Sequence, residues 1–296
     1  MAMVETKSPG ERALHGVNLI LLTFLSVLFF YPMWHCLMAS FSEPTALIGL
    51  KSLLWKPIGF SVEGYKTVLR NHNIYVGYGN TLFYVIVGTC LNLFLTICGA
   101  YGISRKGSLF AKPLTMFIVL TMYVDFGLVP SFLNVRDLGL YDSRWAILLP
   151  GAISTYNMIV MRTAINAVPK SLEESAMMDG ATDITILARI LVPCTKATIA
   201  VVALSYVVGH WNSWFSASIY LQDRGKFPLQ LFLREILINN SSTAASGEGS
   251  SVDGFLYLDE LIKYCTIIIS TVPILCAYPF VQKYFVTGMM LGSVKG

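Results

Sequence analysis

The sequence predicts an all-α protein that crosses a membrane with six helices. Of its 296 residues, 55% are hydrophobic and only 13% are charged, whereas an ordinary soluble domain is about 25% charged. A chain this long has too few charges to cover a water-facing surface. Its apolar side chains also gather in six runs of roughly 20 residues, which is the length that crosses a bilayer. These observations exclude a disordered chain, a small disulfide-bonded domain and a typical cytosolic enzyme.

Each apolar run is expected to be a helix, because a segment in lipid must satisfy its backbone hydrogen bonds internally. The first run is longer than the roughly 7–15 apolar residues of a signal peptide, and no clear cleavage site follows it, so we interpret it as a retained span. The third run begins at a proline, which suits a first helical turn. The predicted spans are Val17–Ala39, Asn80–Ser104, Pro113–Asn134, Trp145–Ile165, Ala197–Leu221 and Glu260–Gln282.

Six spans place both ends of the chain on the same side of the membrane. Lys and Arg are divided almost evenly between the two predicted sides, so the positive-inside rule does not fix the orientation. One side carries the N-terminal tail 1–16, the long segment 166–196 and the C-terminal tail 283–296, around a spanning domain 17–282. The other side carries the loops 41–76 and 222–259, the second of which contains an amphipathic stretch, Pro228–Ile238.

Motifs for covalent chemistry are missing from the sequence. It has no phosphate-binding Gly-x-x-x-x-Gly-Lys-[Ser/Thr] loop, no His-Glu-x-x-His and no Gly-x-Ser-x-Gly. Its four histidines are scattered, which does not indicate a metal site, and five of its six cysteines lie in apolar runs. A net charge of +4 is too small to indicate nucleic-acid binding. We therefore expect a conduit, an anchor or a receptor rather than an enzyme.

The segment 166–196 is the one long polar stretch between two spans. Ser171 and Glu174 have the spacing of a capping box, which predicts the start of a short helix. Gly180 predicts its end, because glycine is favoured just past a helix C-terminus. The sequence therefore predicts a short helix that stops at a glycine corner.

A second short helix is expected directly after this corner. Thr182 or Asp183 would be its N-cap, and Pro193 would stop it before the fifth span. Its apolar residues recur at helical spacing and so share one face: Ile184, Leu187, Ala188 and Leu191. The two helices would form a unit outside the bilayer, shaped to dock into a groove on another protein.

The alternative is an amphipathic helix that lies on the membrane surface. Such helices usually carry Lys and Arg on the polar face, where they meet anionic lipid. This segment instead carries four acidic residues, which favours docking on a protein: Glu173, Glu174, Asp179 and Asp183.

Several motifs resemble a known family. The pattern Glu174-Ser175-Ala176, with a glycine four residues later and Ile190-Leu-Val-Pro193 beyond it, resembles the Glu-Ala-Ala loop of ABC importer permeases. Ser175 and Val192 depart from that pattern but preserve residue size. Three further stretches are similar to maltose-type carbohydrate-uptake permeases, especially those for oligo- and polysaccharides: Trp145–Pro150, His210–Phe215 and Tyr284–Gly296.

The resemblance implies the type I ABC importer permease fold, in a bacterial cytoplasmic (inner) membrane with both termini in the cytoplasm. The 166–196 loop would then be a coupling helix that sits in a groove on an ATPase subunit. Carried over by motif, the coupling residues are Glu174, Ala176, Asp179, Gly180, Ile190 and Pro193. In the C-terminal tail, Gly288 and Lys295 would reach toward the same ATPase.

The resemblance also implies partners. These are a second homologous permease, two copies of the ATPase subunit, and an extracytoplasmic solute-binding protein that meets loops 41–76 and 222–259, besides membrane lipid. ATP and Mg would bind the ATPase subunits, and this chain would bind no cofactor and no nucleic acid. The cargo would be an oligo- or polysaccharide, with acidic uronate oligomers such as alginate as admissible as neutral ones.

Three other functions remain open on the sequence alone. The same kind of importer could carry a peptide, an amino acid or a phosphodiester. An ion-driven secondary transporter is a second possibility, although such transporters usually show inverted repeats, and no clear internal repeat is visible here. The third is a membrane-anchored scaffold without transport.

Polar groups inside the spans are candidates for the translocation path. Aromatic rings with hydrogen-bonding neighbours suit sugars, whose C–H faces stack and whose hydroxyls need partners. The alternative is that the aromatic rings form an interfacial belt or pack helices together. The path candidates are Asp125, Asn157, His210, Trp211, Asn212 and Trp214. Asn92 and Thr96, four residues apart on one face, are instead expected to join neighbouring helices.

Overall fold

The computed structural model consists of helices joined by turns, and it divides into two units. Unit 1 comprises Met1–Asn71 and Ile236–Thr271, and unit 2 comprises His72–Glu235 and Val272–Gly296. In the described part of the chain, extended pairing is limited to an isolated antiparallel bridge between Ser42 and Phe60. The all-α prediction is therefore confirmed. The described residues are 9–47, 53–105, 111–124, 126–245, 260–276 and 279.

Unit 1 is built around the first predicted span. Helix α1, Pro9–Ser40, covers Val17–Ala39 and begins eight residues before it, within the segment taken as an N-terminal tail. The shorter helices α2, Pro44–Leu47, and α3, Glu63–Arg70, follow. Residues 260–276 are also helical, which agrees with the start of the sixth predicted span, and its remaining residues lie almost wholly outside the described part.

Close packing joins α3 to the 260–276 helix within unit 1. A Cβ on Gly64 would lie 2.6 Å from Cys265 Sγ and 2.7 Å from Leu261 Cγ, so only glycine fits between them. The Sγ of the buried Cys265 donates to the Ser40 carbonyl at 3.4 Å. The Ser40 hydroxyl in turn bonds the Tyr65 hydroxyl at 2.7 Å. The end of α1 is thereby fixed to α3.

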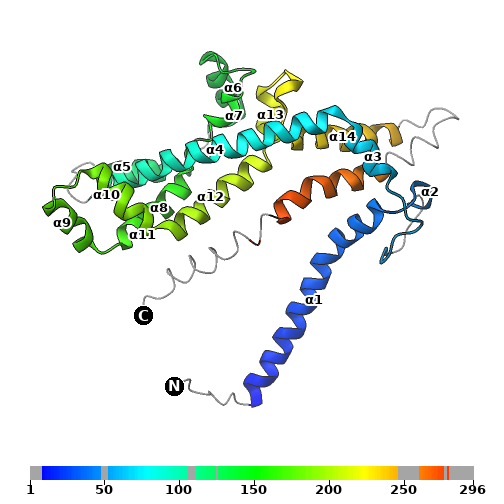
Figure 1. Cartoon of the computed structure of the whole chain (residues 1–296), viewed down its shortest axis with the longest axis horizontal. Helices are drawn as coiled ribbons and strands as arrows, with labels where there is room; N and C mark the ends of the chain where they lie inside the picture. Colours follow the sequence, from blue (N-terminus) through cyan, green and yellow to red (C-terminus); the bar gives the residue numbers. More distant parts are fainter. Residues whose placement is uncertain are drawn as a thin grey trace. The chain divides into compact units, whose positions relative to one another are not determined.

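Unit 2 is organised around one long helix, α4, His72–Ser104 (Figure 1). It contains the second predicted span and starts eight residues before it. Helices α8, Thr155–Ala167, and α12, Lys196–Trp211, pack along it. Helix α5, Ala111–Leu120, also contacts it. The buried core between these helices lies near the Ser104 end of α4 and is formed by Ala100, Ile103, Met158, Met161, Ile165, Ile186 and Leu191.

Three predicted spans are interrupted, so the expectation of one continuous helix in each is wrong. The third is divided into α5 and α6, Leu128–Asp137, where Gly127 has a φ of +81°. The fourth is divided into α7, Trp145–Leu148, and α8, with Pro150 and Gly151 in the break. The fifth is divided into α12 and α13, Phe215–Tyr220. At the end of α12 the side-chain Nδ2 of Asn212 and its backbone N–H both donate to the Val208 carbonyl, at 3.0 and 3.1 Å.

At the end of α4 opposite Ser104, a turn of 3-10 helix, η2, Arg224–Lys226, packs against α4. It leads into α14, Leu229–Ala245, which covers the predicted amphipathic stretch. The residues of α14 up to Glu235 belong to unit 2. Tyr84 and Phe232 belong to the buried cluster at this end, together with Leu148 of α7.

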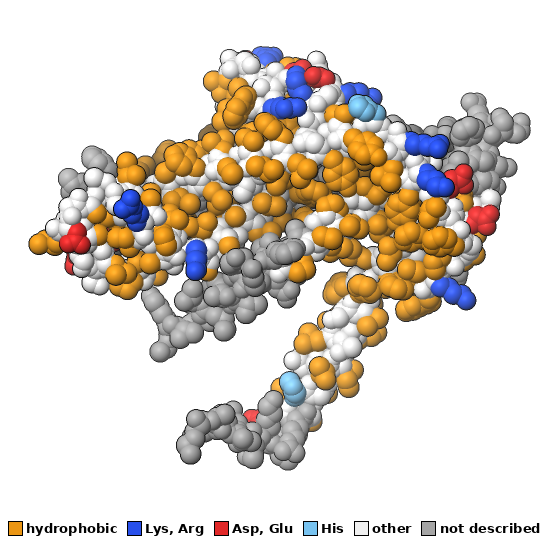
Figure 2. Space-filling model, viewed as in Figure 1, with side chains coloured by type: hydrophobic (Ala, Val, Ile, Leu, Met, Phe, Trp, Pro, Cys, Tyr) orange, Lys and Arg blue, Asp and Glu red, His pale blue; other side chains and the backbone are white. Residues whose placement is uncertain are grey.

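Two helices of the described part, Ala13–Ser40 and His72–Ser104, are long and apolar enough to cross a membrane alone. A third candidate joins Asp183–Cys194 to Lys196–Trp211 across a bend of 85°. The interruptions shorten the helices of the third, fourth and fifth predicted spans, and the sixth lies partly outside the described residues. Figure 2 shows charged side chains near α9 and on the lobe that holds α6, and a largely hydrophobic face over α4. This distribution is typical of a protein embedded in lipid.

Candidate functional site

The segment between α8 and α12 forms two short helices at a sharp corner, which we call the elbow (Lys170–Ile186). Helix α9, Lys170–Met178, ends in a Schellman motif. The Ala181 N–H donates to the Ala176 carbonyl at 2.9 Å, and the Gly180 N–H donates to the Met177 carbonyl at 3.0 Å. Gly180 has a φ of +78°, which side chains disfavour. The predicted glycine corner is confirmed.

The N-terminus of α9 differs from the prediction. Its N-cap is Pro169 and no side chain caps it, so the capping box of Ser171 and Glu174 is wrong. The proline before Lys170 leads the chain in with extended geometry, which leaves Ser171 inside the first turn. At the second helix, α10 (Asp183–Ile186), the expectation holds: the Thr182 hydroxyl accepts from the Thr185 N–H at 3.4 Å.

Pro193 does not end the second helix as expected. The chain continues from α10 through a π-helical turn, η1 (Leu187–Leu191), into α11 (Val192–Cys194). Pro193 lies in the first turn of α11, where a missing N–H costs little. The helix ends at Thr195, whose side chain and N–H both donate to the Leu191 carbonyl. The 85° bend into α12 follows there.

The elbow buries one side and exposes the other. Ile186 and Leu191 are fully buried against α4 and α8. Ile184, which was expected on the same face as Leu191, is 79% exposed, because the π turn shifts the helical register. Met178 of α9 is 89% exposed. The predicted coupling residues Glu174, Asp179 and Gly180 are exposed, Pro193 is exposed farther along, and Ala176 and Ile190 are half-buried.

Arg105 joins both arms of the elbow to the end of α4. Its Nη1 lies 2.8 Å from Glu173 Oε2 of α9, and its Nη2 lies 2.6 Å from Asp183 Oδ1 of α10. The guanidinium also stacks 4.3 Å above the Tyr101 ring, whose hydroxyl donates to Asp183 Oδ1 at 3.1 Å. One planar group thus bridges three elements, which a Lys ammonium could not do with the same geometry.

Polar side chains form a seam between α4 and α12. The Asn92 amide donates to His210 Nε2 at 3.0 Å, and both residues are buried. Gly88 makes room for this histidine, since a Cβ there would lie 2.5 Å from His210 Nε2. The geometry therefore assigns His210, a path candidate from the sequence, a packing contact between two helices. Asn92 has the expected interhelical role.

Tyr206 extends this seam to α8. Its hydroxyl lies 2.7 Å from Thr96 Oγ1 and accepts the backbone N–H of Ser154 at 3.1 Å. Ser154 is the N-cap of α8, and its hydroxyl accepts from the Asn157 N–H. Tyr206 thus accepts a backbone N–H at the break in the fourth span, because Ser154 precedes α8 and has no helical carbonyl to donate to.

The other path candidates each have a different environment. Asn157 is buried and its amide donates to Ser205 at 3.4 Å, while Trp211 is buried with its ring edge-on to Tyr78. Asn212 is exposed at the end of α12. Trp214 stacks under Arg234, whose guanidinium carbon lies 3.4 Å from the ring centroid. Three predicted residues, Asp125, Gly288 and Lys295, lie outside the described residues.

At the end of α4 away from the elbow, the loop 221–228 is fastened to the helix. The Asn80 amide donates to the carbonyls of Gly225 and Phe227, at 2.8 and 3.1 Å. The Tyr84 hydroxyl donates to the Lys226 carbonyl at 2.7 Å. These α4 side chains are buried, so the loop follows the position of the helix.

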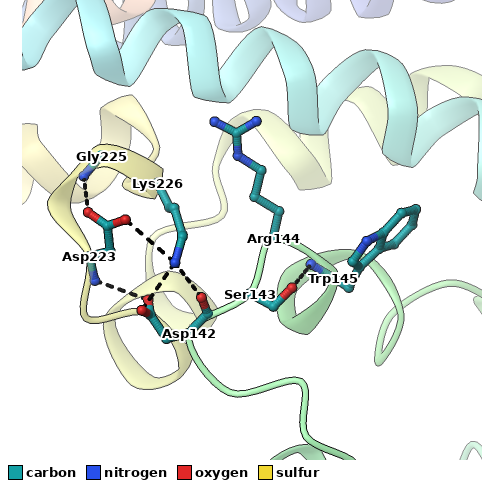
Figure 3. Close-up of a pocket in the computed structure, with 7 residues that line it drawn as sticks. All are labelled: Asp142, Ser143, Arg144, Trp145, Asp223, Gly225 and Lys226. Carbon is teal, nitrogen blue, oxygen red and sulfur yellow. Dashed lines mark hydrogen bonds and ion pairs between the residues drawn. The ribbon is translucent and has the colours of Figure 1, made fainter.

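An open pocket of about 450 Å³ lies beside this loop (Figure 3). Asp142 organises it: its Oδ1 accepts the N–H groups of Gln222 and Asp223, both at 3.0 Å. Lys226 points at Asp142 and donates to its carbonyl and its carboxylate. Arg144 points away toward α4, where it donates to Asn80 Oδ1 at 2.9 Å.

The charges in the pocket stabilise one another. The two backbone N–H donors and Lys226 hold the pKa of Asp142 below its ordinary value. The same carboxylate raises the pKa of Lys226. Asp142 has a φ of +54°, which aspartate tolerates better than most residues. The loop is therefore held by an ionised aspartate at neutral pH.

Sequence reasoning missed four of the residues that organise these sites. Arg105 and Tyr206 bond partners tens of residues away, so no local pattern reveals them. Asn80 and Asp142 act on backbone groups of the loop 221–228, which carries no partner motif. The available signal was chemical: an arginine at the end of an apolar run, and an asparagine and a tyrosine within one.

Comparison with known proteins finds relatives that match nearly the whole chain. A polygalacturonan/rhamnogalacturonan transport system permease of Bacillus subtilis (strain 168) is 38% identical over 90% of this chain and 92% of its own length. The protein LplC of the same bacterium is 35% identical over the full length of both. A chain of a bacterial ABC transporter that imports the acidic polysaccharide alginate superposes with a TM-score of 0.85 and 30% identity, covering 95% of this chain and all of that one.

The sequence profile of one family matches residues 74–290. That range includes all but the first two residues of α4, the elbow, the polar seam and the loop 221–228. It is described as the inner membrane component of binding-protein-dependent transport systems. The chain belongs to this family, the permease subunits of ABC transporters, and its relatives carry sugars and polysaccharides.

Proposed function

We propose that this chain is one of two permease subunits in a bacterial importer that moves an acidic oligo- or polysaccharide into the cell, with ATP hydrolysed by separate subunits. The elbow would dock in a groove on one ATPase copy, with both chain termini on that cytoplasmic side. Residues Gly288 and Lys295 would approach the same ATPase. A second homologous permease would carry the other ATPase copy.

The exposed face of the elbow is the observation that carries this proposal. Met178 and Ile184 are 89% and 79% exposed at the corner, beside the carboxylates of Glu174 and Asp179. Apolar groups rimmed by charge are typical of a surface that a partner covers. The buried side of the same elbow packs on α4 and α8, so a push on its exposed face is carried into the spanning helices.

A bulky residue at the corner tests the docking. In a reconstituted complex with its ATPase and binding protein, we expect Gly180→Trp to abolish the stimulation of ATP hydrolysis by loaded binding protein. Gly139→Trp is the matched control, because Gly139 also has a positive φ, +68°, with nothing within 4 Å of its added Cβ, but lies far from the elbow in sequence. Equal stimulation in the two variants would contradict the docking.

The three interruptions support a count of six spans, three of which would be broken helices rather than continuous ones. We propose that α5 with α6, α7 with α8, and α12 with α13 each cross the bilayer as one broken span. Irregular backbone at membrane depth is tolerated where it is buried in protein or lines a water-filled cavity. The translocation path would therefore run beside these breaks, near Asp125, Asn157 and Asn212, with Trp211 and Trp214 at its outer part.

The far end of α4 would face the extracytoplasmic binding protein. The loop 221–228 and the pocket beside it lie at this end of α4, and the elbow lies at the other end (Figure 1). Loops 41–76 and 222–259 would supply the contact surface, as the sequence predicted. The loop is held firmly to α4, which suits a part that must respond to a docked partner.

The relatives support an acidic cargo. Polygalacturonan and alginate are both polymers of uronic acids, and proteins named for each match this chain at 38% and 30% identity. We expect oligogalacturonate or oligomannuronate, presented by the cognate binding protein, to stimulate ATP hydrolysis in the complex. Neutral galacto-oligosaccharides of equal length are the matched comparison. Stimulation by the neutral oligomers alone would contradict an acidic cargo.

A further inference from the structure

We propose that Arg105 is a positioning residue that fastens the elbow to α4, so that α4 carries movement between the elbow and the loop 221–228. The inference rests on the proposed docking of the elbow on an ATPase. It adds the route within this chain by which movement at the ATPase side is transmitted to the opposite end of the subunit.

The contacts of Arg105 fix both arms of the elbow at once. Glu173 lies on α9 and Asp183 lies on α10, on either side of the glycine corner, and one guanidinium bonds both. Arg105 and Glu173 are three-quarters or more buried at their side chains, so water screens this contact less than a surface pair. Tyr101 supports the guanidinium from α4 itself. Displacing the corner therefore either breaks these contacts or moves the end of α4 with it.

The covalent connections of the elbow are irregular. Toward α12 the chain passes through the π turn of η1 and then bends by 85° at Thr195. Toward α8 it passes through Val168 and Pro169 in extended conformation. Both connections depart from regular α-helix, whereas the bridge through Arg105 is short and planar.

The opposite end of α4 is fastened equally closely. Asn80 and Tyr84 bond three successive carbonyls of the loop, from Gly225 to Phe227. The Thr81 hydroxyl accepts the Leu229 N–H at 2.9 Å, at the start of α14. Between these contacts and Arg105 the chain is a single helix without proline. One stiff element therefore joins the two surfaces that the proposed function assigns to different partners.

The test measures how strongly loaded binding protein stimulates ATP hydrolysis in the reconstituted complex. We expect Arg105→Gln to lower that stimulation by about fivefold or more, the size of an ordinary coupling between sites. Arg105→Lys should restore part of it, because an ammonium can satisfy one carboxylate but not the fork. Arg136→Gln is the matched control, since Arg136 pairs with the adjacent Asp137 at an exposed site, and it should behave as wild type.

A cycle of variants separates positioning from folding. If Arg105 acts through Asp183, the pair Arg105→Gln with Asp183→Asn should lose no more stimulation than Arg105→Gln alone. If Arg105→Gln fails to assemble, Glu173→Gln with Asp183→Asn makes the same test with the arginine kept. Full stimulation in either of these neutralised complexes overturns the inference. Absence of stimulation in the wild-type complex would instead contradict the proposed function.

Discussion

At the scale of single residues, Gly88 is held to glycine by the ring of His210. Three atoms of that ring would lie 2.5–2.9 Å from an added Cβ. The ring is buried and bonded to Asn92, so it cannot move aside without losing that hydrogen bond. We expect Gly88→Ala to destabilise the protein by about 1–3 kcal/mol, as overpacking does, measured as thermal unfolding of the purified complex.

The same helix offers a control for this substitution. Gly79 and Gly102 have no atom within 4 Å of an added Cβ. Alanine at either position should be neutral or slightly stabilising, because glycine in a helix is about 0.5–1 kcal/mol worse than alanine. If Gly88→Ala proved as harmless as Gly79→Ala, the seam between α4 and α12 would not be packed as described.

Tyr206 makes a second prediction at this scale. Phenylalanine at this position keeps the ring but leaves the Ser154 N–H and the Thr96 hydroxyl without their partner. A buried group left unbonded costs about 1–3 kcal/mol. Tyr206→Phe should therefore lower the stability of the complex more than Thr96→Val, which leaves the bond to Ser154 in place. Equal losses in the two variants would contradict the role of Tyr206 at the break in the fourth span.

At the scale of elements, the loop 221–228 should respond to pH through Asp142. Backbone N–H donors and Lys226 lower the pKa of this carboxyl in the folded protein. Its stabilising effect is thus fully present above the unfolded pKa of about 3.9 and is lost as pH falls through the lower folded value. The wild type should lose its advantage in thermal stability over Asp142→Asn as pH decreases below about 4.

Asp137→Asn provides the comparison for this titration. Asp137 is 69% exposed at its side chain and pairs with its neighbour Arg136. Its replacement should shift stability little, because an exposed ion pair contributes little. A constant difference in thermal stability between wild type and Asp142→Asn from pH 6 to pH 3 would contradict this prediction. It would show that Asp142 holds the loop without its charge.

The elements also show what a sequence can and cannot reveal. The glycine corner was predictable, because a Schellman motif depends on residues within one turn of Gly180. The helices α1 and α4 were predictable from uniform apolar runs. The breaks in three spans were not, because apolar composition is the same whether the backbone is helical or not. Only the 149–154 break carries a Pro-Gly pair. The Ser154 N–H in this break donates to the hydroxyl of Tyr206, more than fifty residues away.

The contacts of Arg105 escaped prediction for a related reason. Arg105 and Asp183 are separated by 78 residues, and each looks locally like a solvated charge. The exposed position of Ile184 depended on a π turn that no spacing rule anticipates. Long-range polar contacts and departures from helical period both arise from packing, so they appear only once the helices are assembled.

At the scale of the whole molecule, the proposed orientation in the membrane can be tested by labelling one natural cysteine, Cys194. Cys194 is exposed and lies in α11, on the side of α4 that holds the elbow. The proposal places it in the cytoplasm, whereas Arg224 of the loop 221–228 would lie outside. In a variant that keeps Cys194 and lacks the other five cysteines, a membrane-impermeant maleimide should label inside-out vesicles and leave right-side-out vesicles unlabelled. A cysteine-free chain carrying Arg224→Cys should give the opposite pattern. Labelling of both positions from one side would overturn the assignment of the elbow and the loop to different partners, since a single ATPase-facing surface could not also receive an extracytoplasmic binding protein.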